Sequence, residues 1–276
     1  MTEELGAQVS TSAGLSPAAR RVLAAIGSVV FLAVLVGAWH LAVAFDLVKE
    51  IILPFPFDVG QALVDTSQDS FFYKHLWITT QEVIYGFLIG SAIGFTLGAL
   101  LGGSRWAREI AYPYVVAFQG LPKIVLAPVF ITAFGFGMNS KIAMAVAISF
   151  FPVLINTMVA FTSLDPNALR LMQSLTASRR HVFMKLAIPH SLPLVFAGLK
   201  TGLTLALVGA IVGEFIQTSE GLGYLLGNYA FQLQIARMYA VMIILALLGV
   251  ILFLALEALD RKLVFWRSER GLTATM

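Results

Sequence analysis

Polar side chains are scarce in this chain, and residues 177–193 (ASRRHVFMKLAIPHSLP) form the clearest group of them. Three permanent cations, Arg179, Arg180 and Lys185, lie here between long apolar runs. Clustered cations beside apolar side chains can bind an anionic bilayer surface, or they can dock onto a soluble partner protein. Both interpretations predict a binding segment rather than a catalytic one.

The basic segment and the residues before it predict two short helices joined by a turn. Asp165 followed by Pro166 is a typical helix start, because aspartate caps free amides and proline fits the first turn. Ser178 can cap a second short helix, which we expect to end at Ile188 because Pro189 disfavours helix in the residue before it. The apolar side of this second helix consists of Val182, Phe183, Leu186 and Ala187.

Lys123 lies inside an apolar run, between Pro122 and Pro128. A lysine at mid-membrane depth costs about 2.5–3.5 kcal/mol. Its head would lie about 15 Å from either interface, which makes snorkelling the less favoured alternative. Prolines are tolerated where a helix lines a cavity, so we expect Lys123 to attract an anionic solute along a pathway. Further candidates for this pathway are Phe118, Gln119, Phe134 and Asn156, of which Asn156 could equally bridge two helices.

Carboxylates are expected only near the ends of apolar runs, at Glu82, Glu214 and Glu257. Ion-driven carriers place carboxylates inside the membrane, so ion coupling is not favoured. Glu214 is a candidate for an outer gate, with a surface carboxylate as the equal alternative. Neither a G-x-x-x-x-G-K-[ST] loop nor an H-E-x-x-H motif occurs, and no metal site is predicted. If the protein pumps, a separate chain must supply the energy.

The composition defines the class of protein that must position these residues. Of 276 residues, 59% are hydrophobic and 12% are charged, with a mean hydropathy of +0.87. Soluble domains carry about 25% charged residues. The chain has no cysteine, which excludes disulfides, a thiol nucleophile and cysteine metal ligands. We expect an all-α polytopic membrane protein, because in lipid a helix satisfies its own backbone.

Apolar runs long enough to cross a bilayer predict six spans, at 22–45, 79–103, 110–135, 140–161, 193–214 and 237–259. The first run ends in a sequence like a signal-peptide cleavage site, but its length favours an uncleaved span. With both termini cytoplasmic, thirteen Lys and Arg residues lie inside, and four lie at or near the outer side: Lys49, Lys74, Lys141 and Arg237. The expected parts are a disordered tail (1–19), a transmembrane domain (20–265) and a cytoplasmic tail (266–276).

The second apolar run contains a glycine every four residues. This spacing bares one helix face and predicts close packing against another helix. The glycines are Gly86, Gly90, Gly94, Gly98 and Gly102. Residues 46–78 are expected outside the membrane, with a short surface helix.

Residues 165–193 (DPNALRLMQSLTASRRHVFMKLAIPHSLP) resemble the cytoplasmic "EAA" loop of binding-protein-dependent ABC importer permeases. The similarity covers about 50–265. It includes LPFP (53–56), LPKIVLAPVFITAFGFG (121–137) and GLKTGLTLALVGAIVGEFIQTSEGLGYLL (198–226). These motifs resemble the branch that imports nitrate, sulfonates, taurine, aromatic acids or pyrimidine vitamin precursors. The resemblance implies the type I importer permease fold.

The loop matches the family's pattern at Leu175, Ala177, Ser178, Phe183, Ile188, Pro189 and Pro193. It departs from the pattern at Arg170, Met172 and Thr176. Thr176 stands where the family usually has glycine, so the turn there must be one that a non-glycine residue tolerates. The resemblance implies contact with an ATPase subunit through Leu175, Thr176, Ala177, Ser178, Arg179, Phe183 and Pro189, within coupling helices at 165–190.

The resemblance also implies the partners. These are a second copy of the chain, two ATP-binding cassette subunits that hold ATP and Mg, and a periplasmic solute-binding protein. The chain itself would bind no cofactor and no nucleic acid, would catalyse no reaction, and would lie in the bacterial inner membrane. Import would proceed by alternating access, and Lys123 favours a small anionic solute. The alternative is a secondary carrier or channel with a basic lipid-binding loop; a membrane-embedded enzyme lacks a catalytic constellation.

Overall fold

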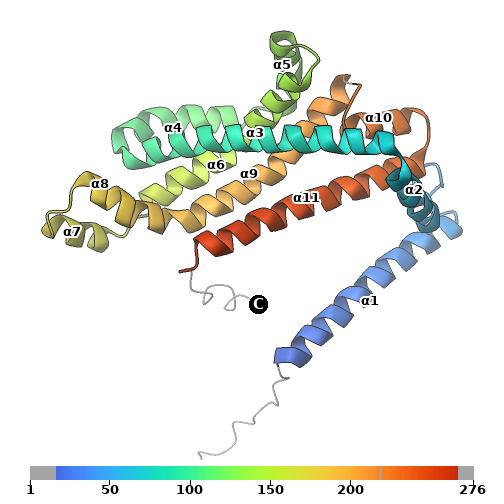
Figure 1. The fold of residues 1–276 in the computed structure, drawn as a ribbon, viewed down its shortest axis with the longest axis horizontal. Coiled ribbons are helices and arrows are strands. Elements are labelled where there is room, and N and C mark those ends of the chain that lie inside the picture. Colours follow the sequence, from blue (N-terminus) through green and yellow to red (C-terminus); the bar gives the residue numbers. More distant parts are fainter. Residues whose placement is uncertain (1–16, 218, 267–276) are drawn as a thin grey trace, which may run out of the picture. The chain divides into compact units, whose positions relative to one another are not determined.

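The computed structural model describes residues 17–217 and 219–266, and these form helices joined by turns (Figure 1). The all-α prediction is confirmed. The α-helices are α1 (Pro17–Ala44), α2 (Pro56–Gln68), α3 (Ser70–Gly103), α4 (Arg105–Gln119), α5 (Ala127–Phe134), α6 (Met138–Thr162), α7 (Pro166–Ser174), α8 (Arg179–Val182), α9 (Ile188–Gln217), α10 (Leu222–Phe231) and α11 (Ile235–Leu263). A 3₁₀-helix, η1 (Lys123–Leu126), precedes α5, and a π-helical turn, η2 (Phe183–Ala187), precedes α9.

Five helical stretches among the described residues are long and apolar enough to cross a membrane. A sixth crossing exists only if α4 and the η1–α5 pair count as one span, and these are bent by 88°. The span predicted at 110–135 is therefore broken into two helices. The helix ends at Gly120, and Pro122 is extended (φ −63°, ψ 99°), because proline has no amide hydrogen to continue the α-helical ladder.

The second span begins earlier than the sequence suggested. Asp69 caps α3 by accepting a hydrogen bond from the Phe71 amide at 2.9 Å, so α3 starts at Ser70 instead of residue 79. The last residues of the expected outside segment are thus helical. The short helix expected within that segment is α2.

The described chain divides into two compact units, residues 1–61 and 62–276. In the first unit, the Trp39 Nε1–H donates to the Pro54 carbonyl at 2.9 Å, and the rings of His40 and Phe55 lie 5.4 Å apart. These contacts hold the Pro-rich turn after α1 against the end of that helix.

The core of the second unit is α6 packed between α3 and α9. The predicted glycine face of α3 is confirmed, because all five glycines meet α6. A Cβ at Gly94 would lie 2.8 Å from the Phe150 carbonyl oxygen, and one at Gly98 would lie 2.6 Å from that of Leu154. On the other side of α6, a Cβ at Gly209 of α9 would lie 2.8 Å from the Ala145 Cα. Backbones this close fix the three helices relative to one another.

Candidate functional site

The loop segment (residues 165–190) contains the two short helices and the turn that the sequence predicted. Asp165 caps α7 by accepting from the Asn167 amide at 2.9 Å, and Ser178 caps α8 by accepting from the His181 amide at 3.4 Å. Between them Thr176 has a φ of +54°. This left-handed conformation is the one that glycine adopts most easily, so Thr176 occupies a mildly strained turn.

The second helix of the loop segment does not end at Ile188, and this part of the prediction is wrong. Ile188 donates its amide to the Phe183 carbonyl, five residues back, within the π-helical turn η2. The wider turn lets the helix continue through Pro189, which has no amide to donate, and through Pro193. Residues 179–216 consequently form one continuous candidate span that carries the loop segment at its start.

Several apolar side chains of the loop segment are exposed. Leu175 is 67% exposed and Phe183 is 42% exposed. Phe183 also stacks on Phe161 of α6, with ring centroids 5.7 Å apart. A pocket of about 280 Å³ brings together the predicted residues Ala177, Arg179 and Phe183. Thr176 and Ser178 are exposed and Pro189 is half-buried. The loop segment thus offers a basic surface with apolar side chains, and the stacked rings of Phe183 and Phe161 join it to α6.

Two of the predicted pathway residues are brought together at the break between α4 and α5. The Lys123 Nζ donates to the Gln119 carbonyl at 3.2 Å and lies 5.1 Å from the centroid of the Phe151 ring. Pro122 precedes η1 and Pro128 lies in the first turn of α5, so both prolines begin helices rather than kinking one. Phe118 and Phe134 are exposed.

Asn156 makes its described contacts elsewhere. Its side-chain amide donates to the Pro152 carbonyl at 2.8 Å. A Cβ at Gly198 of α9 would lie 2.7 Å from the Asn156 Cβ. Asn156 therefore forms a hydrogen bond within its own helix and packs against α9.

Glu214 is buried at the far end of α9, with 1% of its surface exposed, so the surface-carboxylate alternative is wrong. The Thr79 hydroxyl donates to its Oε1 at 2.5 Å, and the Gly223 amide donates to its Oε2 at 2.6 Å. Gly221 has a φ of +109° and lies directly against the carboxylate. A side chain at position 221 would collide with Glu214, and glycine also tolerates this backbone conformation.

Glu82 and Lys141 form a buried ion pair beside Glu214. The Lys141 Nζ lies 2.6 Å from Glu82 Oε1 and donates to the Glu220 carbonyl at 3.3 Å. Lys141 is buried, because α6 places it between α3 and the end of α9. We name five buried residues the polar cluster: His75, Thr79, Glu82, Lys141 and Glu214.

The polar cluster also binds the first turn of α10 through backbone amides. The Gly221 amide donates to His75 Nδ1 at 2.9 Å, and the Leu222 amide donates to Thr79 Oγ1 at 2.8 Å. Sequence analysis missed His75, Thr79 and Glu82 as site residues. A signal was present, because positions 75, 79 and 82 lie on one helical face, which continues into the glycine face at Gly86.

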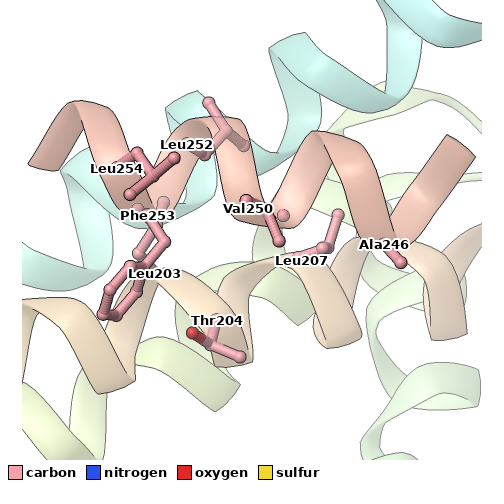
Figure 2. A pocket seen from close by; sticks show the side chains of 9 residues that line it. Leu203, Thr204, Leu207, Ala246, Val250, Leu252, Phe253 and Leu254 are labelled. Carbon is pink, nitrogen blue, oxygen red and sulfur yellow. The ribbon is translucent and has the colours of Figure 1, made fainter. Parts of the chain in front are cut away.

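A further pocket, of about 370 Å³, lies between α9 and α11 (Figure 2). Apolar residues line it, together with Thr204. The Thr204 hydroxyl donates to the Lys200 carbonyl of its own helix at 3.2 Å. The lining offers no charged group to a solute, so this pocket does not extend the predicted pathway.

The helices define a polytopic membrane protein with an exposed basic loop at one end of α9 and a buried polar cluster at the other. The chain belongs to the family described as "Binding-protein-dependent transport system inner membrane component", whose model matches residues 90–265. It is therefore a member of the ABC importer permeases, and the resemblance seen in the sequence is confirmed.

Permeases named for different solutes are similar to nearly the whole chain. The formylaminopyrimidine transport permease ThiX of Halalkalibacterium halodurans is 31% identical, over 91% of this chain and 100% of its own. The riboflavin permease RibX of Chloroflexus aurantiacus is 31% identical, over 89% and 91%. The taurine permease TauC of Escherichia coli is 27% identical, over 92% and 93%.

A solved structure shares the fold. The inward-facing MetNI methionine ABC transporter matches with a TM-score of 0.58 and 19% identity, over 70% of this chain and 94% of the matched chain. This similarity confirms the type I importer permease fold.

Proposed function

We propose that this chain is the membrane subunit of an ATP-driven importer that moves a small anionic solute from periplasm to cytoplasm by alternating access. Two copies would pair with two ATPase subunits and one periplasmic solute-binding protein in the bacterial inner membrane. The observation that carries the proposal is the loop segment, because it presents an exposed surface at the start of a continuous helix.

The continuity of α9 supports mechanical coupling across the membrane. The chain runs from the capped helix α8 through η2 into α9 without a break, and Glu214 lies near the end of α9. Figure 1 shows α7 and α8 together at one end of the second unit and α10 at the other. A partner that displaces the loop segment would therefore move the helix that carries Glu214.

Lys123 supports an anionic solute within the sulfonate, nitrate, aromatic acid or pyrimidine-precursor classes. It is the cation at the break between α4 and α5, and its described contacts are a carbonyl and an aromatic ring. Neither contact neutralises the charge, so the ammonium remains able to attract an anion. The printed names of the relatives cover several solutes and do not select one of them.

Docking of the ATPase is tested by Phe183→Ala in the reconstituted complex, with Phe265→Ala as the matched control. Phe265 is an exposed aromatic residue just beyond α11. We expect Phe183→Ala to reduce co-purification with the ATPase and to lower coupled ATP hydrolysis by about tenfold or more, because anchor residues dominate interfaces.

Phe183→Ala also removes the stacking contact with Phe161, so Leu175→Asp serves as a second variant at an exposed position. If both variants bind the ATPase and hydrolyse ATP as the unmodified chain does, the proposed docking role of the loop segment is wrong.

The role of Lys123 is tested by solute uptake into liposomes that contain the complete complex. We expect Lys123→Met to slow the uptake of an anionic solute several-fold, and Lys123→Arg to retain most of it because the charge is kept. Uptake at the unmodified rate by Lys123→Met would remove Lys123 from the pathway.

A further inference from the structure

The polar cluster contains two carboxylates and one lysine, all buried. Glu82, Glu214 and Lys141 are at most 4% exposed. His75 is neutral in this arrangement, because its Nδ1 accepts the Gly221 amide and so carries no proton. With both glutamates ionised, the cluster would hold a net charge of −1 away from water, which is costly.

The two carboxylates have different surroundings. Glu214 accepts hydrogen bonds on both oxygens and lies at the N-terminus of α10, where the helix dipole favours an anion. Glu82 has Lys141 at its Oε1, and its Oε2 has no hydrogen-bond donor in residues 17–217 and 219–266. The cluster is therefore built to hold an ionised Glu214, and it leaves one oxygen of Glu82 unsatisfied.

We propose that Glu82 and Glu214 form a proton-binding site. In this site Glu82 is protonated and donates a hydrogen bond to the ionised Glu214. Glu82 lies three residues after Thr79 on the same face of α3, and Thr79 contacts Glu214, so the two carboxylates are neighbours. Protonation would bring the net charge of the cluster to zero and would turn the unsatisfied oxygen of Glu82 into a donor.

Among residues 17–217 and 219–266, the other cation near the site is Lys74, which already has a carboxylate partner. Lys74 pairs with Glu220 at 2.6 Å on the exposed side of α3, so these two charges compensate each other. Tyr224 of α10 stacks on His75. The charged and titratable groups around the site are Asp69 at the N-cap of α3, Lys74 and His75 from α3, Lys141 from α6, Glu220 from the connection after α9, and Tyr224 from α10.

The bound proton would stabilise the attachment of α10. Three successive amides, of Gly221, Leu222 and Gly223, donate to His75, Thr79 and Glu214. Loss of the proton would place two like charges together and weaken the hold on this first turn. If the proposed function is correct, the end of the protein that carries Glu214 would open more readily as the pH rises. The proton site itself does not depend on that function.

Infrared spectroscopy of the purified full-length chain tests the site, with Glu82→Gln as the variant and Glu109→Gln as the matched control at an exposed position. We expect the carbonyl band of a buried protonated carboxyl group at neutral pH. The band should be lost on alkaline titration, be absent in Glu82→Gln and be kept in Glu109→Gln. A missing band in the unmodified chain, or one that persists in Glu82→Gln, would overturn the proposal.

Amide hydrogen exchange at residues 221–223 tests the consequence. After correction for intrinsic rates, we expect protection in the unmodified chain to fall about tenfold from neutral to alkaline pH. Glu82→Gln should keep its protection, because its side-chain amide can still donate to Glu214. The same pH dependence in both chains would contradict the proposal.

If Glu82→Gln does not fold, the infrared titration of the unmodified chain still decides whether the proton is present. Neither measurement involves an ATPase or transport, so failure of the proton site and failure of the proposed function can be told apart.

Discussion

The two ends of α9 are built in opposite ways. At its start, the loop segment is exposed, contains a left-handed threonine and contacts α6 through the stacked rings of Phe183 and Phe161. At its end, Glu214 is enclosed by side chains and amides from α3 and α10. Exposed polar segments exchange partners at low cost, whereas buried charge networks resist change. Helix α9 therefore connects an exposed surface that can change partners with a buried end that is held in place.

The largest expected effect comes from removing the cation of the polar cluster. Lys141→Met would leave the negative charge of Glu214 buried beside Glu82 without a counter-charge, and we expect a loss of about 3–5 kcal/mol of stability. Thermal unfolding in detergent would measure it, against Lys49→Met as a control at an exposed lysine.

The double variant Lys141→Met with Glu214→Gln sharpens this prediction, because it also removes the stranded negative charge. It should recover more than half of the loss. Equal unfolding temperatures for Lys141→Met and Lys49→Met would show that the polar cluster contributes no more to stability than an exposed lysine does.

An intermediate effect is expected at the turn of the loop segment. Thr176→Gly relieves the left-handed strain but adds freedom to the unfolded chain, so the net gain should be roughly 0–1 kcal/mol. Thr96→Gly, at an exposed helical position of α3, should instead lose about 0.3–0.5 kcal/mol. Chemical unfolding of both variants provides the comparison. A loss at position 176 as large as that at position 96 would mean that the turn is not strained.

The smallest effect concerns the exposed pair beside the polar cluster. The hydrogen bond and the charge of Lys74 hold the pKa of Glu220 below its ordinary value. A lowered pKa stabilises the fold above the ordinary value, and the contribution is lost as the pH falls through the lowered one. Lys74→Gln should therefore be slightly less stable near neutral pH and equally stable in acid.

Added salt should reduce this difference, because the pair is exposed. Unfolding temperatures at several pH values would measure it. A difference that stays constant down to strong acid would exclude the Glu220 contribution.

Sequence reasoning located the loop segment because its residues are contiguous. Asp165, Ser178 and Thr176 mark two caps and a turn within a short stretch, and local rules suffice for such a motif. The same rules failed at Pro189, because a π-helical turn let the helix continue. Pro122 and Pro128 were expected inside one span, and the chain instead turns by 88° there.

The polar cluster could not be read from the sequence in this way. Thr79 and Glu214 are 135 positions apart, and they meet only because α3 and α9 pack against α6. Glu82 and Lys141 each stood near the end of an apolar run, where a charge normally reaches water. Glu82 and Lys141 are buried by tertiary packing, which a local sequence pattern does not predict.

The five glycines of α3 constrain how this membrane protein can change shape. Each one lets the backbone of α3 rest on α6 at a successive turn, from Ala145 to Phe161. Sliding one helix along the other would drive Cβ atoms of α6 into the α3 backbone between glycines. We therefore expect α3 and α6 to tilt together as one rigid unit whenever access to the solute pathway changes. The rearrangement would then fall to the bent α4–α5 element and to the helices that flank this unit.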